Sequence, residues 1–573
     1  MLLATLCVGL MLRGAAAAEV TALPGLEGGL TSRMFSGYLQ ASADHYLFYV
    51  LVESKSAPAT DPLMIWTNGG PGCSSMLGFF TEHGPYLVTN TPGKLVSNQY
   101  SWNAAANYLY IEHPIGVGFS YSTHHAHYSE LNDDSEADEL YNGLLDFYSQ
   151  FPEFKERDLY LTGESYAGQY VPHLAHRIAH GANAQLANSL RGFAVGNPVF
   201  DCESYNHDGS WATMTLNMLY YTGLIPYAGP YASFMTKGCG EPATMTNKCW
   251  IHFNKAYDLA GSWSQGLAAA QTDQISPTRS GDQSDGFPTA PSQRRSQSSI
   301  QRNRRMDKLR ARFGNPKASE DESQQHGKHT SHGRRAGSTG AGANTLDPSS
   351  ESEPPSALSM VAANTNATER LDNEPDYDPD NKYGSFCTGN SSLDHAVLPN
   401  ANGHRCLPLG SHLEQWLNRS DVQSALHVAH APLGGTWAEC ASAHGWSYET
   451  SGTNVVKAYY EPLFHKLNAS RFRVLVYSGI EDIGVVTPAE TQQCVAELHS
   501  SAIGNHTHEW EPWRRDGTPL GYWEAYERLT FATIKGAGHM APTNQPVASA
   551  QLLYRWLHHN DLSHPVREGL FVK

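Results

Sequence analysis

Short runs of apolar residues recur in both halves of the chain, and each run is bounded by glycine, proline, asparagine or aspartate. Runs of this length and setting are typical of buried strands. We predict strands over residues 45–52, 62–68, 107–112, 158–164, 191–197, 471–479 and 528–536. Two intervening stretches have helical periodicity: residues 133–151 open with acidic side chains, and residues 546–559 begin with a proline. Strands that alternate with helices indicate a mostly parallel sheet covered on both faces.

The alternation of strands and helices stops after Asn197 and returns only near residue 470. Within this interval, residues from about 266 to 381 are rich in Ser, Gln, Arg, Gly, Pro and Asp and poor in apolar side chains. Such a segment cannot bury enough surface to offset the entropy of ordering it, so we predict disorder there. The main domain is then discontinuous: residues 19–199 and 441–573 form its two halves, and residues 200–440 form an inserted cap region.

The N-terminus carries an apolar run from Leu2 to Leu12, followed by small residues from Ala15 to Ala18. This pattern predicts a signal peptide over residues 1–18, although the usual positive charge before the apolar run is missing. A buried N-terminal helix is the alternative. The run is too short to span a membrane, and we predict no membrane span elsewhere.

Composition narrows the class of protein further. The formal net charge of −17 argues against a nucleic-acid binder. Of the nine cysteines, only Cys7 lies in the predicted signal peptide, which leaves an even number for disulfides. Five sequons for N-glycosylation occur, at Asn366, Asn390, Asn418, Asn468 and Asn505. Together these features favour the secretory pathway, with a vacuolar, lysosomal or extracellular destination.

The segment LYLTGESYAGQYVP, residues 159–172, carries the strongest chemical signal. A predicted strand runs into the tight sequence GESYA around Ser165, and a helix is expected to follow. This is the pattern of a nucleophile elbow, a turn that projects a serine above the carboxyl edge of a sheet. Ala167 stands where glycine is commoner, and a chance Gly-x-Ser turn is the alternative interpretation.

Later segments supply an acid and a base in the chain order that α/β-hydrolases use. The segment VLVYSGIEDIG, residues 474–484, ends a predicted strand with Glu481 and Asp482. The segment FATIKGAGHMAP, residues 531–542, places His539 after the last predicted strand. Because a histidine takes the serine proton and a buried acid orients its ring, these residues are the candidates for base and acid.

Five motifs resemble those of the serine carboxypeptidases, a family of α/β-hydrolases. They are WTNGGPGCSS (66–75), EHPIGVGFSYS (112–122), GESYAGQYVP (163–172), NRSDVQSALHV (418–428) and GAGHMAP (536–542). The resemblance covers roughly residues 25–260 and 385–570. It implies an α/β-hydrolase with a central, mostly parallel sheet and an inserted cap. It also implies a serine-type carboxypeptidase that releases C-terminal amino acids from peptides and proteins through an acyl-enzyme, favoured at acidic pH. No cofactor or metal is implied, and a homodimer is compatible with the family.

The resemblance assigns catalytic roles by position. Ser165 is the expected nucleophile, His539 the general base and Asp482 the acid. The first Asp of the family's Gly-Asp-x-Asp acid motif is an isoleucine in this chain, but the second is kept. The backbone N–H groups of Gly70 and Tyr166 are the expected oxyanion hole.

A carboxypeptidase also needs a receptor for the terminal carboxylate of its substrate. The matching residues are Asn68 and Glu164, supported by Glu82. Two adjacent, poorly solvated glutamates raise one another's apparent pKa, so a protonated Glu164 can donate a hydrogen bond to that carboxylate. The alternative is that Glu82 and Glu164 are ordinary surface acids.

Disulfides follow from the same resemblance, because sequence alone does not fix their connectivity. The implied pairs are Cys73–Cys440, Cys239–Cys249 and Cys387–Cys406. Cys202 and Cys494 have no assigned partner.

Two other functions stay open. Some relatives are acyltransferases with the same triad, but they tend to carry Asp before the nucleophile, where this chain has Glu164. A non-catalytic binding or protective role would be expected if a triad residue were missing, and none is.

Overall fold

The computed structural model describes residues 18–566, with gaps. The residues outside the description are 90, 203–209, 222–229, 237, 238, 240–248, 250, 254, 256–409, 469, 484 and 499. The chain divides into two compact units, of which the second is Asp285–Asp372. That unit, the segment predicted to be disordered and the predicted signal peptide up to residue 17 therefore lie outside the described residues.

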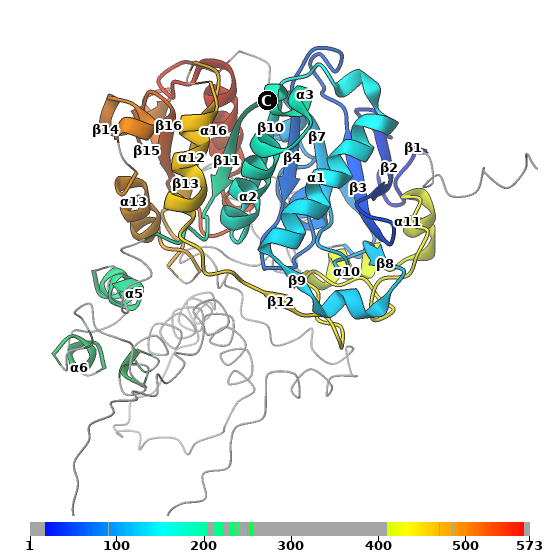
Figure 1. Cartoon of the computed structure of the whole chain (residues 1–573), viewed down its shortest axis with the longest axis horizontal. Helices are drawn as coiled ribbons and strands as arrows, with labels where there is room; N and C mark the ends of the chain where they lie inside the picture. Colours follow the sequence, from blue (N-terminus) through cyan, green and yellow to red (C-terminus); the bar gives the residue numbers. More distant parts are fainter. Residues whose placement is uncertain are drawn as a thin grey trace, which may run out of the picture. The chain divides into compact units, whose positions relative to one another are not determined.

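A 12-stranded sheet forms the centre of the first unit, with the order β1-β2-β3-β7-β4-β10-β11-β13-β16-β15-β14 and with β8 beside β3 (Figure 1). The middle six strands run parallel: β7 (Asn107–Ile111), β4 (Leu63–Thr67), β10 (Leu159–Glu164), β11 (Leu190–Gly196), β13 (Arg473–Gly479) and β16 (Leu529–Ile534). Antiparallel strands complete both ends: β1 (Ala18–Val20), β2 (Met34–Gln40), β3 (His45–Val52), β8 (Tyr121–Ser122), β15 (Thr518–Tyr526) and β14 (His506–Arg515). The sheet is mixed and mostly parallel, as predicted.

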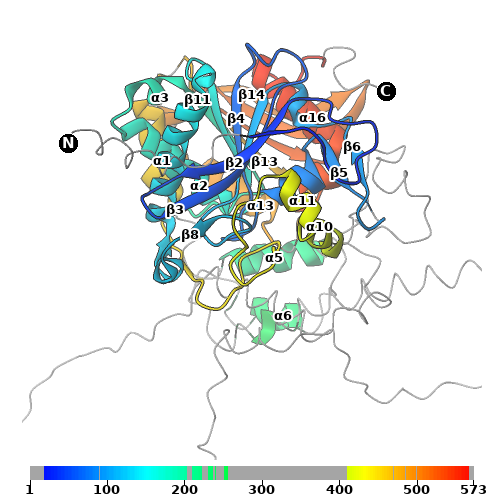
Figure 2. The same cartoon turned by 90° about the vertical axis from the view of Figure 1, so that its right-hand side faces the viewer.

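Helices cover both faces of this sheet. Figure 2 shows α1 (Asp133–Gln150) and α2 (Ala167–His180) on one side and α16 (Pro546–His559) on the other. The remaining described helices are α3 (Ala184–Ser189), α5 (Ser210–Tyr221), α6 (Pro230–Thr236), α10 (Gly410–Leu417), α11 (Ser420–Ala425), α12 (Glu461–Lys466), α13 (Pro488–Ala496), α14 (Ser500–Ile503) and α15 (Ala541–Asn544). None of the helices in the described part of the chain combines the length and apolar character of a membrane span.

Local sequence explains where α1 begins. The side chain of Asn132 accepts hydrogen bonds from the backbone of Asp134 and Ser135, and the Ser135 hydroxyl accepts one from the backbone of Asn132. This capping box satisfies N–H groups that have no partner inside the helix. The acidic residues of the first turn add a favourable interaction with the helix dipole.

All seven predicted strands form, but β2 and the β14–β15 hairpin were not predicted. Most of β14 is exposed, and it is the last strand of the sheet. Its charged side chains face solvent rather than the core. They also break up the apolar run from which a strand is predicted. The pairing of β11 with β13 joins the two predicted halves across the cap region, so the sheet is discontinuous in sequence.

Two small sheets and several short turns of helix complete the described architecture. The sheets pair β5 (Tyr86–Val88) with β6 (Leu95–Ser97), and β9 (Leu131–Asn132) with β12 (Tyr448–Glu449). The second pair brings a segment that follows the cap region against the start of α1.

Candidate active site

The predicted triad residues follow strands whose carboxyl ends share one edge of the sheet. Ser165 comes directly after β10, Asp482 follows β13, and His539 follows β16. These strands are parallel members of the consecutive set β10-β11-β13-β16. All three residues therefore leave the sheet at the same edge.

Ser165 occupies a strained turn between β10 and α2. Its φ of 61° is in the left-handed region, which residues other than glycine rarely adopt. The turn is held by its carbonyl, which accepts the N–H of Gly168 at 2.9 Å and that of Val199 at 2.8 Å. A Cβ at Gly163 would stand 2.5 Å from the Cβ of Ala167. Residue 163 must therefore be glycine, and its lack of a side chain leaves room for the alanine at position 167.

Asp482 and His539 form a close pair. The Nδ1 of His539 lies 2.7 Å from Oδ2 of Asp482, a contact that favours Asp482 over Glu481 as the acid. Asp482 is fully buried and also accepts the backbone N–H groups of Val485 at 3.0 Å and Val486 at 3.1 Å. With its Nδ1–H donated to the carboxylate, the imidazole presents Nε2 as the basic nitrogen.

Asn197 is a residue of this site that sequence analysis missed. Its side-chain amide donates to Oδ2 of Asp482 at 2.9 Å, and its carbonyl oxygen accepts the N–H of Gly479 at 3.1 Å. Like Ser165, it has a positive φ, of 41°. A polar residue directly after β11, at the edge where the triad gathers, was the available signal.

The loop after β4 lies against the elbow. A Cβ at Gly69 would stand 2.3 Å from the backbone nitrogen of Tyr166 and 2.8 Å from the Cβ of Ser165, so only glycine allows this approach. Among hydrogen bonds between described residues, none uses the N–H of Gly70 or of Tyr166. Both residues therefore keep a backbone donor beside the nucleophile.

Asn68, Glu82 and Glu164 form a buried cluster next to Ser165. The side-chain nitrogen of Asn68 donates to Glu82 at 3.1 Å and to Glu164 at 3.0 Å. Its orientation is fixed because its oxygen accepts the indole N–H of Trp66 at 2.7 Å. The three side chains of the cluster are at most 4% exposed. The interpretation of the two glutamates as surface acids is therefore wrong.

Burial raises the pKa of the Glu164 carboxyl well above its ordinary value, and the neighbouring charge of Glu82 raises it further. The negative charge of Asp482 acts in the same direction, while the hydrogen bond from Asn68 lowers the pKa. A proton held by one of two adjacent carboxyl groups relieves their mutual repulsion. This pair can therefore present a protonated carboxyl group beside the nucleophile.

A strap, which we define as residues 439–451, binds the loop after β4 to the chain that follows the cap region. Cys440 forms a disulfide with Cys73. The backbone of Ser74 donates to the carbonyl of Glu439 at 2.8 Å, and that of Ala441 donates to the carbonyl of Gly72 at 2.8 Å. The strap therefore fixes the loop that carries the expected oxyanion donor Gly70.

Two further disulfides lie in the described residues. One joins Cys239 to Cys249, and the other joins Cys202 to Cys494, for which the sequence assigned no partner. The implied pair Cys387–Cys406 lies outside the described residues.

The three described sequons differ in how their asparagines are used. Asn468 and Asn505 are exposed. Asn418 instead donates both amide hydrogens, to the carbonyls of Glu414 at 2.8 Å and Trp437 at 2.9 Å. A glycan on Asn418 would remove one of these bonds, so we expect glycosylation at Asn468 and Asn505 and not at Asn418. Asn366 and Asn390 lie outside the described residues.

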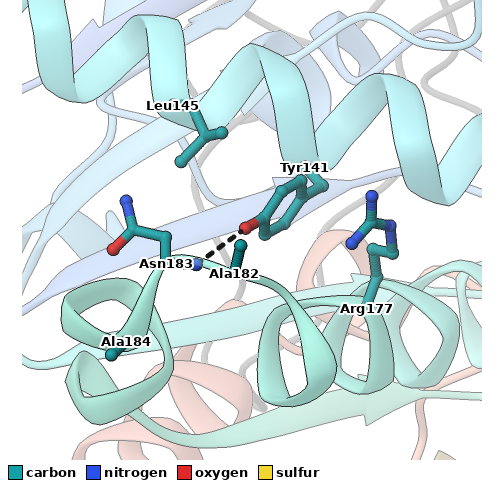
Figure 3. A pocket seen from close by; sticks show the side chains of 6 residues that line it. All are labelled: Tyr141, Leu145, Arg177, Ala182, Asn183 and Ala184. Atoms are coloured by element: carbon teal, nitrogen blue, oxygen red, sulfur yellow. Dashed lines mark hydrogen bonds between the residues drawn. The ribbon is translucent and has the colours of Figure 1, made fainter.

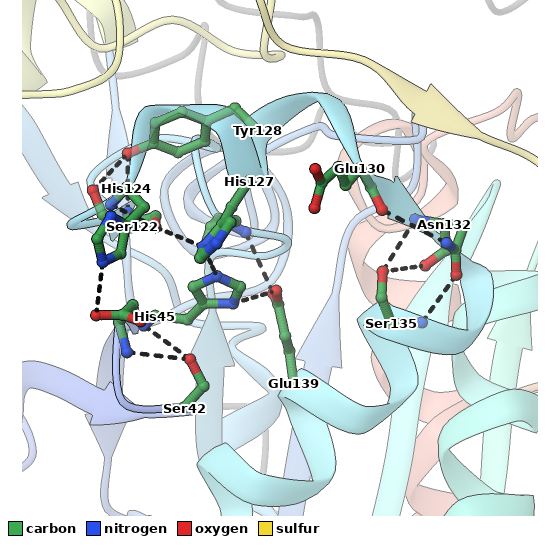
Figure 4. Close-up of polar contacts among 12 residues, drawn as sticks. Ser42, His45, Ser122, His124, His127, Tyr128, Glu130, Asn132, Ser135 and Glu139 are labelled. Carbon is green, nitrogen blue, oxygen red and sulfur yellow. Dashed lines mark hydrogen bonds and ion pairs between the residues drawn. The ribbon is translucent and has the colours of Figure 1, made fainter.

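Two polar features lie apart from the triad. Figure 3 shows a pocket of about 560 Å³ that is lined by Tyr141, Leu145, Arg177, Ala182, Asn183 and Ala184. It adjoins the end of α2 opposite to the nucleophile elbow. Figure 4 shows a chain of contacts in which His45 bridges His127 and Glu139, each at 2.8 Å. No group of side chains in the described part of the chain is arranged to hold a metal ion.

Comparisons with known proteins show a family and solved structures that this chain resembles. A model of the serine carboxypeptidase family matches residues 24–559. The chain is 30% identical to serine carboxypeptidase-like 22 of Arabidopsis thaliana over 554 residues, which cover 95% of this chain and 93% of that protein. It is 41% identical to the lysosomal protective protein of Mus musculus over 237 residues, covering 41% of this chain and 46% of that protein. The crystal structure of Kex1(delta)p, a prohormone-processing carboxypeptidase from Saccharomyces cerevisiae, has the same fold, with a TM-score of 0.56, 17% identity and coverage of 95% and 96%.

Proposed function

Because the chain belongs to the serine carboxypeptidase family, we propose that it is an active serine-type carboxypeptidase that releases C-terminal amino acids from peptides and proteins. One observation carries the proposal: a buried carboxyl pair that favours a proton lies directly beside the elbow serine. A hydrolase that acts anywhere along a chain has no need of such a group. An enzyme that binds the free carboxylate of a peptide needs a protonated carboxyl group, because an ionised glutamate would repel its substrate.

The proposed reaction uses the triad in its usual roles. Ser165 attacks the carbonyl carbon of the last peptide bond while His539 takes its proton, and Asp482 stabilises the imidazolium. The N–H groups of Gly70 and Tyr166 stabilise the oxyanion. His539 then protonates the leaving amine, an acyl-enzyme forms, and water releases the shortened peptide by the same steps in reverse.

Substrate selection is assigned to the buried cluster of Asn68, Glu82 and Glu164. The protonated carboxyl of the pair donates a hydrogen bond to the terminal carboxylate, and Asn68 fixes the orientation of both glutamates. As pH rises and the pair loses its proton, repulsion weakens peptide binding. Activity on peptides is therefore favoured at acidic pH.

An acidic destination of the secretory pathway suits this pH preference. The family and the three disulfides of the described residues are consistent with the secretory pathway. We propose a vacuolar, lysosomal or extracellular location.

Two measurements on the purified protein test the proposed function. A fluorophosphonate probe should label the protein covalently, and the Ser165→Ala variant should not be labelled. A blocked dipeptide with a free C-terminus should be cleaved to a free amino acid. An acyltransferase would be labelled but would transfer acyl groups from glucose esters and leave the dipeptide intact. A non-catalytic protein would give neither result.

A further inference from the structure

Asp133, the first residue of α1, is a buried carboxylate in contact with the elbow and with the strap. It is only 2% exposed. Its Oδ1 accepts the hydroxyl of Tyr166 at 2.8 Å and the hydroxyl of Tyr448 at 2.8 Å. Its Oδ2 accepts the backbone N–H of Ser451 at 2.7 Å. Two segments far apart in sequence therefore meet on one carboxyl group.

A second connection runs from Tyr448 to the loop after β4. The ring of Tyr448 packs edge-on against the ring of Tyr170, with 6.1 Å between the ring centroids. The oxygen of Tyr170 accepts the N–H of Gly72 at 3.1 Å. Gly72 lies in the same tight loop as Gly70, whose N–H is one expected oxyanion donor.

The direction of every hydrogen bond in this network follows from the groups at its ends. A backbone N–H only donates and a carboxylate only accepts. The hydroxyls of Tyr166 and Tyr448 therefore donate to Asp133, and the oxygen of Tyr170 accepts the N–H of Gly72. Without the carboxylate, the hydroxyls of Tyr166 and Tyr448 can turn, and the ring of Tyr448 loses its fixed position against Tyr170.

The three phenols remain donors because burial raises the pKa of Tyr166, Tyr170 and Tyr448 well above its ordinary value. The negative charge of Asp133 raises each of these pKa values further.

We propose that Asp133 is a positioning residue for the oxyanion hole, connected to one backbone donor through Tyr166 and to the other through Tyr448. The side chain of Tyr166 anchors the residue whose own N–H is the first donor. The chain through Tyr448 holds the loop that carries the second. One carboxylate thus keeps two donors from separate segments at a fixed separation, which preorganised stabilisation of an oxyanion requires.

Tyr448→Phe is the main test, because it removes the hydrogen bond that fixes Tyr448 to Asp133. We expect kcat for a blocked dipeptide to fall about tenfold with KM within about twofold, since the loss of a whole donor costs about 100-fold to 1,000-fold. Tyr128→Phe is the matched control. Tyr128 is also buried and its hydroxyl bonds the backbone of Ser122, but it is outside the network. Its kcat should stay near that of the wild type.

Asp133→Asn should lower kcat further, by about 100-fold, because an amide cannot replace a carboxylate that accepts three donors. The double variant Asp133→Asn/Tyr448→Phe separates positioning from general destabilisation. If both residues act through one connection, the double variant should be no slower than Asp133→Asn alone. If Asp133→Asn does not fold, the comparison of Tyr448→Phe with Tyr128→Phe decides alone.

The inference rests on the proposed function, and the outcomes separate the two. A wild-type protein that neither reacts with a fluorophosphonate nor cleaves a dipeptide would overturn both. An active wild type with equal kcat for Tyr448→Phe and Tyr128→Phe would overturn the role of Asp133 alone. Effects of the two substitutions that multiply in the double variant would overturn it as well.

Discussion

Asp482 and Glu164 are two buried carboxyl groups at the same edge of the sheet, and their surroundings differ. Asp482 accepts hydrogen bonds from His539, from the side chain of Asn197 and from two backbone N–H groups. Each of these donors stabilises the charged form. These donors hold the carboxyl group of Asp482 in place beside the imidazole of His539.

Glu164 has far fewer donors. It shares the single amide group of Asn68 with Glu82, and its other close neighbour is a second carboxyl group. Burial without enough donors favours the neutral form, so the pair holds a proton. The comparison teaches that hydrogen-bond donors oppose the effect of burial on a carboxyl group, and that Glu164 has too few of them. The charge of Asp482 also helps to keep Glu164 protonated, so the two sites are electrostatically connected.

Replacing the carboxyl group of Asp482 should have the largest effect on catalysis. Asp482→Asn should lower kcat by about 10,000-fold, because the amide favours the wrong tautomer of His539. KM should change little. Single-turnover acylation by a chromogenic ester measures this loss. Glu481→Gln is the matched control, and an equal loss in that variant would contradict the assignment of the acid.

Removing one hydrogen-bond donor from Asp482 should have a smaller effect on catalysis. Asn197→Ala leaves Asp482 one hydrogen bond short and also frees the N–H of Gly479. We expect kcat to fall about tenfold or more, on the scale of one lost hydrogen bond to a charged group. An unchanged kcat would show that the remaining donors suffice to hold Asp482 in place.

Replacing Glu164 by an uncharged side chain should change the pH dependence of KM rather than the maximal rate. Glu164→Gln remains neutral at every pH and can still donate. The wild-type KM for a peptide should rise as the pair loses its proton, and KM of the variant should stay flat, with a difference of about tenfold at the alkaline end. A variant that keeps the wild-type dependence would refute the carboxylate receptor.

Glu112 extends the comparison to stability. It is fully buried and accepts hydrogen bonds from Ser74, Trp437 and the backbone of Phe119, yet burial raises its pKa to about 7. The folded state therefore binds this proton more tightly than the unfolded state does. Stability is highest at pH values below the unfolded pKa near 4.5 and falls as pH rises through about 7.

Glu112→Gln removes this titration. The melting temperature of the wild type should fall between pH 5 and pH 8, and the fall should be smaller in the variant. The largest difference expected from a shift of this size is about 3 kcal/mol in the free energy of unfolding. Parallel melting curves for the two proteins would contradict the assignment.

Much of the fold could be predicted because buried parallel strands are continuous apolar runs, as in β4 and β10. The β14–β15 hairpin could not, because β14 is mostly exposed and buried residues of β15 such as Trp523 alternate with more exposed ones, so neither strand is a continuous apolar run. Of the site, the elbow and the order of its partners were readable from the chain. Asn197 and Asp133 were not, because each acts only through a partner that folding brings from far along the sequence.

The disulfides show the same limit. Cys202 and Cys494 are separated by 292 residues, and their segments meet beside the paired strands β11 and β13. Asn418 fits the sequon as well as Asn468 does, but its amide is already bonded in the folded chain.

A protonated carboxyl group beside Ser165 is proposed to bind the free carboxylate of the substrate, and the rest of the account depends on this contact. The most direct test compares a blocked dipeptide with the same dipeptide as its C-terminal amide, on the wild-type enzyme, between pH 5 and pH 8. The account predicts that KM for the free acid rises by about tenfold over this range, while KM for the amide stays constant. Parallel pH dependence for the two substrates would contradict it.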